Sequence, residues 1–181
     1  MKTLTIATGV VALGVLSGCQ TFGIGNEEQI TCLQPNRRVV VEVGGAKDAK
    51  PPKPKPGAKP GAKVKPGKPE PIMVSALAQG NTAFDPGSAV LKKGGMEDLD
   101  KMLKLINQGT SRDKRPTHVS SVVLTGHSDR LESAPGDVAL SEARAKSVKA
   151  YLESKGIDKK LIFWQGLGSK VPVPVTKFCE P

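Results

Sequence analysis

The sequence predicts a mixed α/β fold, an α+β sandwich in which helices pack on one sheet. Two segments repeat apolar residues at helical spacing, and short runs of β-branched residues lie before, between and after them. Strands that alternate with helices of this length are typical of such a sandwich. The length of 181 residues leaves room for one domain with extensions.

Two amphipathic helices are expected. The first ends at Gly109 and has its apolar residues at Met96, Leu99, Met102, Leu103 and Ile106. The second closes at Gly156 and has them at Leu140, Ala143, Ala145, Val148, Tyr151 and Leu152. One face of each helix is therefore available to cover a sheet.

Four segments have the composition of strands. Three lie in the second part of the chain, at 73–84, 119–126 and 161–164, and a turn sequence, Asp85-Pro86-Gly87-Ser88, follows the first of them. The fourth, 39–43, is a β-branched run preceded by Pro35. Because an isolated strand is unstable, 39–43 is expected to join the sheet formed by the later segments.

A linker is expected at 45–71, which contains eight prolines and eight lysines. Such a composition cannot form a core, and its like charges extend the chain. This stretch carries +6 of the net charge of +10, so the basic character is mostly a linker property and argues only weakly for nucleic-acid binding. The linker is either passive or touches anionic polymer or lipid headgroups.

The first 19 residues have the layout of an export signal. Lys2 precedes an apolar run from Leu4 to Leu16 that is short for a membrane span, and Leu16-Ser17-Gly18-Cys19 resembles the bacterial lipobox. That resemblance implies a lipoprotein signal peptide at 1–18, lipid attachment at Cys19 and a lipidated tether at 19–30. Gln20 follows the cysteine at the position where an aspartate would suggest retention in the inner membrane. Its presence therefore favours attachment to the outer membrane, on the periplasmic face. The alternative is an ordinary signal peptide with a chance cysteine.

A set of short motifs begins at Gly126 and continues through the second predicted helix: Gly126-His127-Ser128-Asp129, Leu140-Ser141, Arg144-Ala145, Val148, Tyr151-Leu152 and Gly156-Ile157. This set resembles the OmpA-like (OmpA/MotB/Pal type) peptidoglycan-binding domain. Phe84-Asp85 and Gly166-Leu167-Gly168-Ser169 extend the likeness over 72–179. The resemblance implies a βαβαβ-β domain with helices on one mixed sheet.

The last strand of that family is marked by N-R-R-V-E, and a similar sequence, Asn36-Arg37-Arg38-Val39, stands here ahead of the domain. We therefore expect a circular permutation, in which the last strand is supplied from the N-terminal side. The permuted strand occupies 31–44, and the remainder of the domain occupies 72–181. The alternative is that 35–43 is an unrelated strand or a partner-binding arm.

The ligand that the resemblance implies is the diaminopimelate of the peptidoglycan stem peptide. Asp129 would accept a hydrogen bond from its ammonium, and Arg144 would donate two parallel hydrogen bonds to its carboxylate. Arg37 would add a further contact to the ligand. Asp137 stands where the family has asparagine, and Glu132 replaces a glycine. Their added negative charge would favour the ammonium and oppose the carboxylate. In the alternative, Asp129 is only a turn acid and the stem of Arg144 covers the helix edge.

The remaining residues bear on redox state and on rival functions. Cys32 and Cys179 would be joined by a disulfide in an exported, permuted domain, and a metal site is disfavoured because they lack a nearby histidine pair.

No cofactor, enzyme activity or nucleic-acid partner is expected. The two resemblances together imply an outer-membrane lipoprotein that binds peptidoglycan and tethers the membrane to the wall. The alternative is a structural or assembly lipoprotein of an envelope complex with a non-binding domain.

Overall fold

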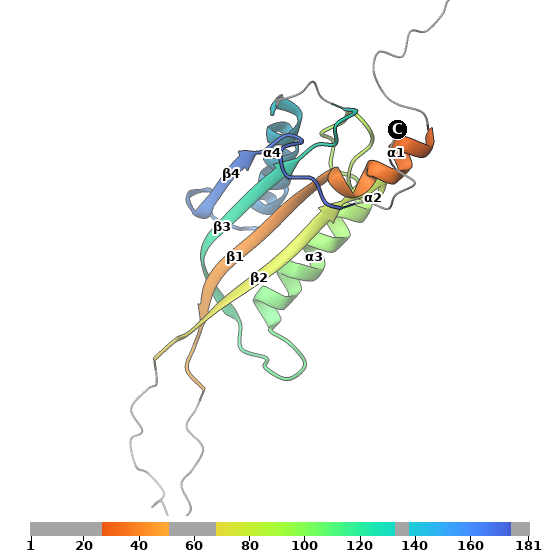
Figure 1. Cartoon of the computed structure of the whole chain (residues 1–181). Helices are drawn as coiled ribbons and strands as arrows, with labels where there is room; N and C mark the ends of the chain where they lie inside the picture. Colours follow the sequence, from red (N-terminus) through yellow and green to blue (C-terminus); the bar gives the residue numbers. More distant parts are fainter. Residues whose placement is uncertain (1–26, 51–67, 133–137, 175–181) are drawn as a thin grey trace, which may run out of the picture.

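The computed structural model describes residues 27–50, 68–132 and 138–174. They form two layers, a four-stranded mixed sheet and a pair of long helices packed on one of its faces (Figure 1). The strand order is β2-β1-β3-β4, with bounds β1 Arg38–Lys47, β2 Glu70–Gln79, β3 Thr117–His127 and β4 Ile162–Gly166. This architecture confirms the predicted fold class.

Strand β1 lies inside the sheet although it comes first in the chain. It pairs antiparallel with β2 on one side and with β3 on the other, and β3 pairs parallel with β4. Val39, Val41 and Val43 are buried on the face that meets the helices, as expected of a β-branched run. The expectation that this segment joins the sheet is therefore confirmed.

The two long helices are α3 (Lys93–Gln108) and α4 (Ala139–Ser154). Helix α3 packs mainly on β2, and α4 packs on β3 and β4. Their predicted apolar faces are buried in the core at Leu99, Met102, Leu103, Ile106, Ala145, Val148 and Leu152. Helix α3 ends at Gly109, whose φ of 68° lies in the left-handed region that glycine adopts readily. Both helix predictions are confirmed.

The strand predicted at 73–84 is wrong at its end. Strand β2 stops at Gln79, because Gly80 has a φ of 67° and turns the chain out of the sheet. The amide of Gly80 donates to the carbonyl of Arg37 at 2.8 Å, and the short helix α2 (Gly80–Ala83) follows. Phe84 is then fully buried in the core rather than extending the strand.

The ends of the linker predicted at 45–71 also differ from expectation. Strand β1 continues to Lys47 and β2 begins at Glu70, and these two residues are register partners. Arg115 stabilises this end of the sheet, because its guanidinium lies 2.7 Å from the Glu70 carboxylate and 2.8 Å from that of Asp113. Residues 51–67 lie outside the described residues.

Short helical segments flank the sheet. Helix α1 (Glu27–Leu33) takes in residues 27–30 of the predicted tether, and the carbonyl of Ile30 accepts a hydrogen bond from Arg37 at 3.0 Å. The 3-10 helix η1 (Gln34–Asn36) then leads into β1, and η2 (Lys159–Leu161) leads into β4. Where the structure describes the chain, no helix has the length and apolarity that a membrane span requires.

Candidate functional site

The pairing of β1 with β3 brings the predicted site residues together. Arg38 and His127 are register partners at one end of these strands, so Arg37 and Asp129 lie just beyond the paired ends. The Arg37 Nη1 atom donates to Asp129 Oδ2 at 2.7 Å, across 92 positions of sequence. Arg144, in the second turn of α4, joins the same group of charges through Glu132. The predicted site residue Asp137 lies outside the described residues.

Arg37 is held on several sides in the interior. Its side chain is fully buried, and besides Asp129 it donates to the carbonyl of Ile30 and to the side-chain oxygen of Asn81. Its Nε atom has no hydrogen-bond partner among the described residues, and Glu132 Oε1 lies 3.8 Å from it. Arg37 is thus an ion-pair centre for two carboxylates.

Asp129 serves as both a turn acceptor and an ion-pair partner. Its Oδ1 atom accepts the backbone N–H groups of Leu131 at 2.8 Å and Glu132 at 3.0 Å, while Oδ2 faces Arg37. Burial raises the pKa of the Asp129 carboxyl, and the nearby charge of Glu132 raises it further, against the lowering effect of Arg37. The acid therefore does more than cap a turn.

The guanidinium of Arg144 is fully buried and has acceptors on every side. Its terminal nitrogens donate to the two carboxylate oxygens of Glu132, at 2.7 and 2.6 Å. Its Nε atom donates to the carbonyl of Ser88 at 2.9 Å, and Nη2 also lies 3.3 Å from the carbonyl of Asp85. The guanidinium also lies 5.3 Å from the centre of the Phe84 ring. Arg144 therefore enters the interior and does not merely cover the helix edge.

Glu132 completes the group of charges. Its side chain is 1% exposed, Oε1 accepts the N–H of Gly87 at 2.9 Å, and Oε2 accepts the N–H of Asp129 at 3.2 Å. We call Arg37, Asp129, Glu132 and Arg144 the charged cluster. It pairs two arginines with two carboxylates, so the buried charges balance when all four groups are ionised.

Two members of this site differ from the sequence-based picture. Glu132 was expected only as an added negative charge near a ligand, whereas it is the direct partner of Arg144. Asn81 was not expected, and it contacts Arg37 from 44 positions away in a stretch without a recognisable motif. The backbone of the turn at 85–88 also contacts Arg144 and Glu132.

Arg38 faces different partners from Arg37. Its side chain donates to Asn36 Oδ1 and to the carbonyl of Val171, outside the charged cluster. Burial lowers the pKa of the Arg38 guanidinium, and burial with the charge of Arg38 lowers the pKa of His127 to about 4. Of the two neighbouring arginines, Arg37 is therefore the one that belongs to the charged cluster.

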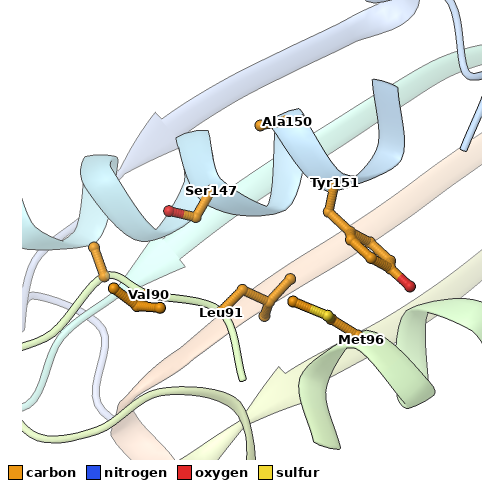
Figure 2. Close-up of a pocket in the computed structure, with 7 residues that line it drawn as sticks. Val90, Leu91, Met96, Ser147, Ala150 and Tyr151 are labelled. Atoms are coloured by element: carbon orange, nitrogen blue, oxygen red, sulfur yellow. The ribbon is translucent and has the colours of Figure 1, made fainter. Parts of the chain in front are cut away.

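A separate hollow lies between the helices. Figure 2 shows side chains of α4 facing Val90, Leu91 and Met96 across it, and its volume is about 480 Å³. No member of the charged cluster lines this hollow. Within the ranges that the structure describes, no group of three or more residues suited to hold a metal ion is present.

Of the three cysteines, only Cys32 lies within the residues that the structure describes. Cys32, in α1, is disulfide-bonded. Cys19 and Cys179 lie outside the described residues, so the lipid attachment and the pairing of Cys32 with Cys179 stay predictions.

The chain is similar to known proteins. The model of the OmpA family matches residues 83–177. Outer membrane protein A of Bordetella avium is 32% identical over 62% of this chain and 54% of its own length, and that of Citrobacter freundii is 38% identical over 50% of this chain and 35% of its own length. The solved OmpA-like domain of FopA1 from Francisella tularensis subsp. tularensis SCHU S4 is 20% identical, with a TM-score of 0.44, over 59% of this chain and 66% of that one.

The matched region contains part of the site and part of the scaffold that holds it. It includes α3, β3, α4 and β4, together with Asp129, Glu132 and Arg144, whereas Arg37, β1 and β2 precede it. The chain spans about half or less of the length of these curated relatives. Because the family model covers more than half of the sequence, the chain belongs to the OmpA family.

Proposed function

We propose that the protein binds peptidoglycan non-covalently, through the diaminopimelate of the stem peptide. The observation that carries the proposal is the convergence of Arg37, Asp129 and Arg144 at one end of the sheet. Membership of the OmpA family, a structural and binding family, supports a binding role over an enzymatic one. Asp137 is the fourth residue assigned to this function.

Diaminopimelate has an end that carries both an ammonium and a carboxylate. A carboxylate acceptor beside an arginine fork is the arrangement that recognises such a zwitterion. Asp129 would accept from the ammonium and Arg144 would donate to the carboxylate. Arg37, bonded to Asp129 at 2.7 Å, orients that acid and balances its charge.

The same proposal includes how the domain reaches the wall. Cys19 carries a lipid that anchors the chain at the periplasmic face of the outer membrane, and the domain tethers this membrane to peptidoglycan. The domain is circularly permuted: β1 replaces the last strand of the family, and the Lys/Pro stretch joins it to β2. The position of β1 between β2 and β3 supports the permutation, as does the Asn36-Arg37-Arg38-Val39 sequence. A Cys32–Cys179 disulfide would join the two ends of the permuted domain.

A second candidate function is a structural or assembly role in an envelope complex, without ligand binding. One observation favours it. Glu132 already occupies the arginine fork that a ligand carboxylate would need. A domain with a permanently filled site would act as a spacer or docking module.

Sedimentation with purified sacculi tests the proposed function. The wild-type protein is expected to sediment and to resist a high-salt wash, because a buried site is screened much less than lysine adhesion. Asp129→Asn, which keeps the side-chain shape, and Arg144→Ala are expected to stay in the supernatant. Arg112→Ala, at an exposed arginine outside the charged cluster, is the matched control and should sediment.

Each variant is checked for folding by its circular dichroism and thermal transition before sedimentation. If folded Asp129→Asn and Arg144→Ala proteins still sediment, the assignment of the site is wrong. Sedimentation that disappears in high salt would indicate adhesion through lysines instead.

A further inference from the structure

We propose that Glu132 is a built-in competitor for the ligand carboxylate, so that the site binds its ligand only by displacing this side chain. The inference rests on the proposed function and concerns the same site. It assigns Glu132 as a residue that sets affinity and ligand choice, beyond the residues expected to grip the ligand.

The surroundings of Glu132 are those of a bound carboxylate. Oε1 receives hydrogen bonds from Arg144 Nη2 at 2.6 Å and from the backbone N–H of Gly87 at 2.9 Å. Oε2 receives them from Arg144 Nη1 at 2.7 Å and from the backbone N–H of Asp129 at 3.2 Å. An arginine fork with two backbone donors is a cradle for a planar anion, and here a side chain of the protein fills it.

Arg144 has no direction left for a second carboxylate. Its Nε atom donates to the carbonyl of Ser88, and its terminal nitrogens reach the carbonyls of Asp85 and His127 as well as Glu132. The guanidinium is fully buried, so an added anion cannot approach it from solvent without a rearrangement. The ligand carboxylate and the Glu132 carboxylate therefore compete for the same two nitrogens.

The ion pairs lead to the same conclusion. The charged cluster contains two arginines and two carboxylates, with side chains of Arg37, Arg144, Asp129 and Glu132 no more than 1% exposed. Each guanidinium already has a carboxylate partner, so a ligand carboxylate finds no unpaired arginine in the cluster while Glu132 is in place. Displacement of Glu132 into solvent frees the guanidinium of Arg144 for the ligand carboxylate. The observed affinity for the ligand is then proportional to the fraction of molecules in which Glu132 has left the cradle.

Isothermal titration of the full chain with a soluble diaminopimelate-containing stem tripeptide tests the competition. Glu132→Gly removes the competitor, and Glu132→Gln keeps its size while removing its charge. Both variants are expected to bind the tripeptide at least about tenfold more tightly than the wild type. Glu97→Gln, at an exposed acid of α3, is the matched control and should bind as the wild type does.

A second measurement does not depend on the tripeptide. In Glu132→Gly the cradle lacks its anion, so sodium acetate is expected to raise the melting temperature of this variant above its value in sodium chloride of equal ionic strength. The wild-type protein, whose cradle is filled, should melt at the same temperature in both salts. This assay also serves if Glu132→Gly is too unstable for titration, because acetate would then restore folding.

The outcomes separate this inference from the proposed function. Tripeptide binding by the wild type, with no gain in either variant and no effect of acetate, would overturn the competitor role and leave the function standing. Failure of every protein to bind the tripeptide, with protection of Glu132→Gly by acetate, would overturn the function and support the filled cradle. Tighter binding by both variants together with acetate protection supports both.

Discussion

Glu132 and Arg144 form a two-point ion pair inside the protein, with N–O distances of 2.7 and 2.6 Å between the carboxylate and the guanidinium. Arg144 comes from the helix that covers β3, and Glu132 comes from the loop that follows β3. Neither charge is stable alone at this depth, so each holds the other in place. The pair fixes the start of α4 to the end of the sheet where Arg37 and Asp129 meet.

Removal of Arg37 is expected to destabilise the fold strongly. Arg37→Ala leaves Asp129 with a buried carboxylate that has lost its nearest cation, at 2.7 Å. Loss of one partner of a buried ion pair typically costs about 3–5 kcal/mol of unfolding free energy. Urea denaturation followed by circular dichroism measures this quantity.

The double variant Arg37→Ala/Asp129→Ala shows whether the pair is the cause. It should lose less unfolding free energy than the sum of the two single variants, because the second substitution removes the uncompensated charge. The exposed residue Arg112 is the control, and Arg112→Ala is expected to change stability by less than about 0.5 kcal/mol. Additive losses in the double variant would contradict the assigned ion pair.

The sequence predicted the scaffold well where periodicity was strong. The apolar residues of α3 and α4 lie on the core side, and the β-branched run at 39–43 became a central strand. Local pattern failed at 80–84, because the positive φ of Gly80 ends β2 and this conformation leaves no trace in hydrophobic spacing. It also failed at Lys47 and Glu70, whose strand pairing extends into a stretch of linker composition.

The site could be predicted only in part, for a physical reason. Asp129 and Arg144 stand in a recognisable spacing, and the resemblance of 36–39 to a displaced strand suggested Arg37. Which acid pairs with which arginine depends on side-chain geometry. Arg37 forms its ion pair with Asp129, and Arg144 forms its ion pair with Glu132. Asn81 reaches Arg37 only through the turn at Gly80, and no spacing rule describes such a contact.

Gly126 is required by the close approach of α4 to β3. A Cβ atom at this position would lie 2.0 Å from the backbone oxygen of Ser141 and 2.8 Å from its carbonyl carbon. Backbone atoms cannot rotate away, so Gly126→Ala must push the start of α4 off the sheet. Overpacking of this kind typically costs about 1–3 kcal/mol, and we expect a loss of unfolding free energy in that range or above it.

Chemical denaturation of Gly126→Ala checks this expectation. Ser120→Ala, at an exposed position on the same strand, is the control and should stay within about 0.5 kcal/mol of the wild type. Because Arg144 lies in the displaced helix, Gly126→Ala should also weaken sedimentation with sacculi. Full stability in Gly126→Ala would mean that α4 packs farther from β3 than the structure has it.

His127 is expected to make stability depend on pH between about 6.5 and 4. Its side chain is buried, Nδ1 has no hydrogen-bond partner among the described residues, and burial with the charge of Arg38 lowers its pKa to about 4. The unfolded chain takes up a proton near the ordinary histidine pKa of about 6.5, whereas the folded protein does so only near 4. The contribution of His127 is therefore fully present above pH 6.5 and is lost as the pH falls toward 4.

The size of this loss is on the order of 3 kcal/mol for a lowering of this extent. His127→Asn removes the titration, so its unfolding free energy should fall less than that of the wild type when urea denaturation is repeated from pH 7 to pH 4. His118→Asn is the matched control, because His118 lies at the exposed start of β3, 3.3 Å from Asp48. Since protonation of Asp129, whose pKa is raised, acts in the opposite direction, the difference between variant and wild type is the quantity to compare. Equal pH dependence in His127→Asn and the wild type would show that His127 is hydrated and not held neutral by the fold.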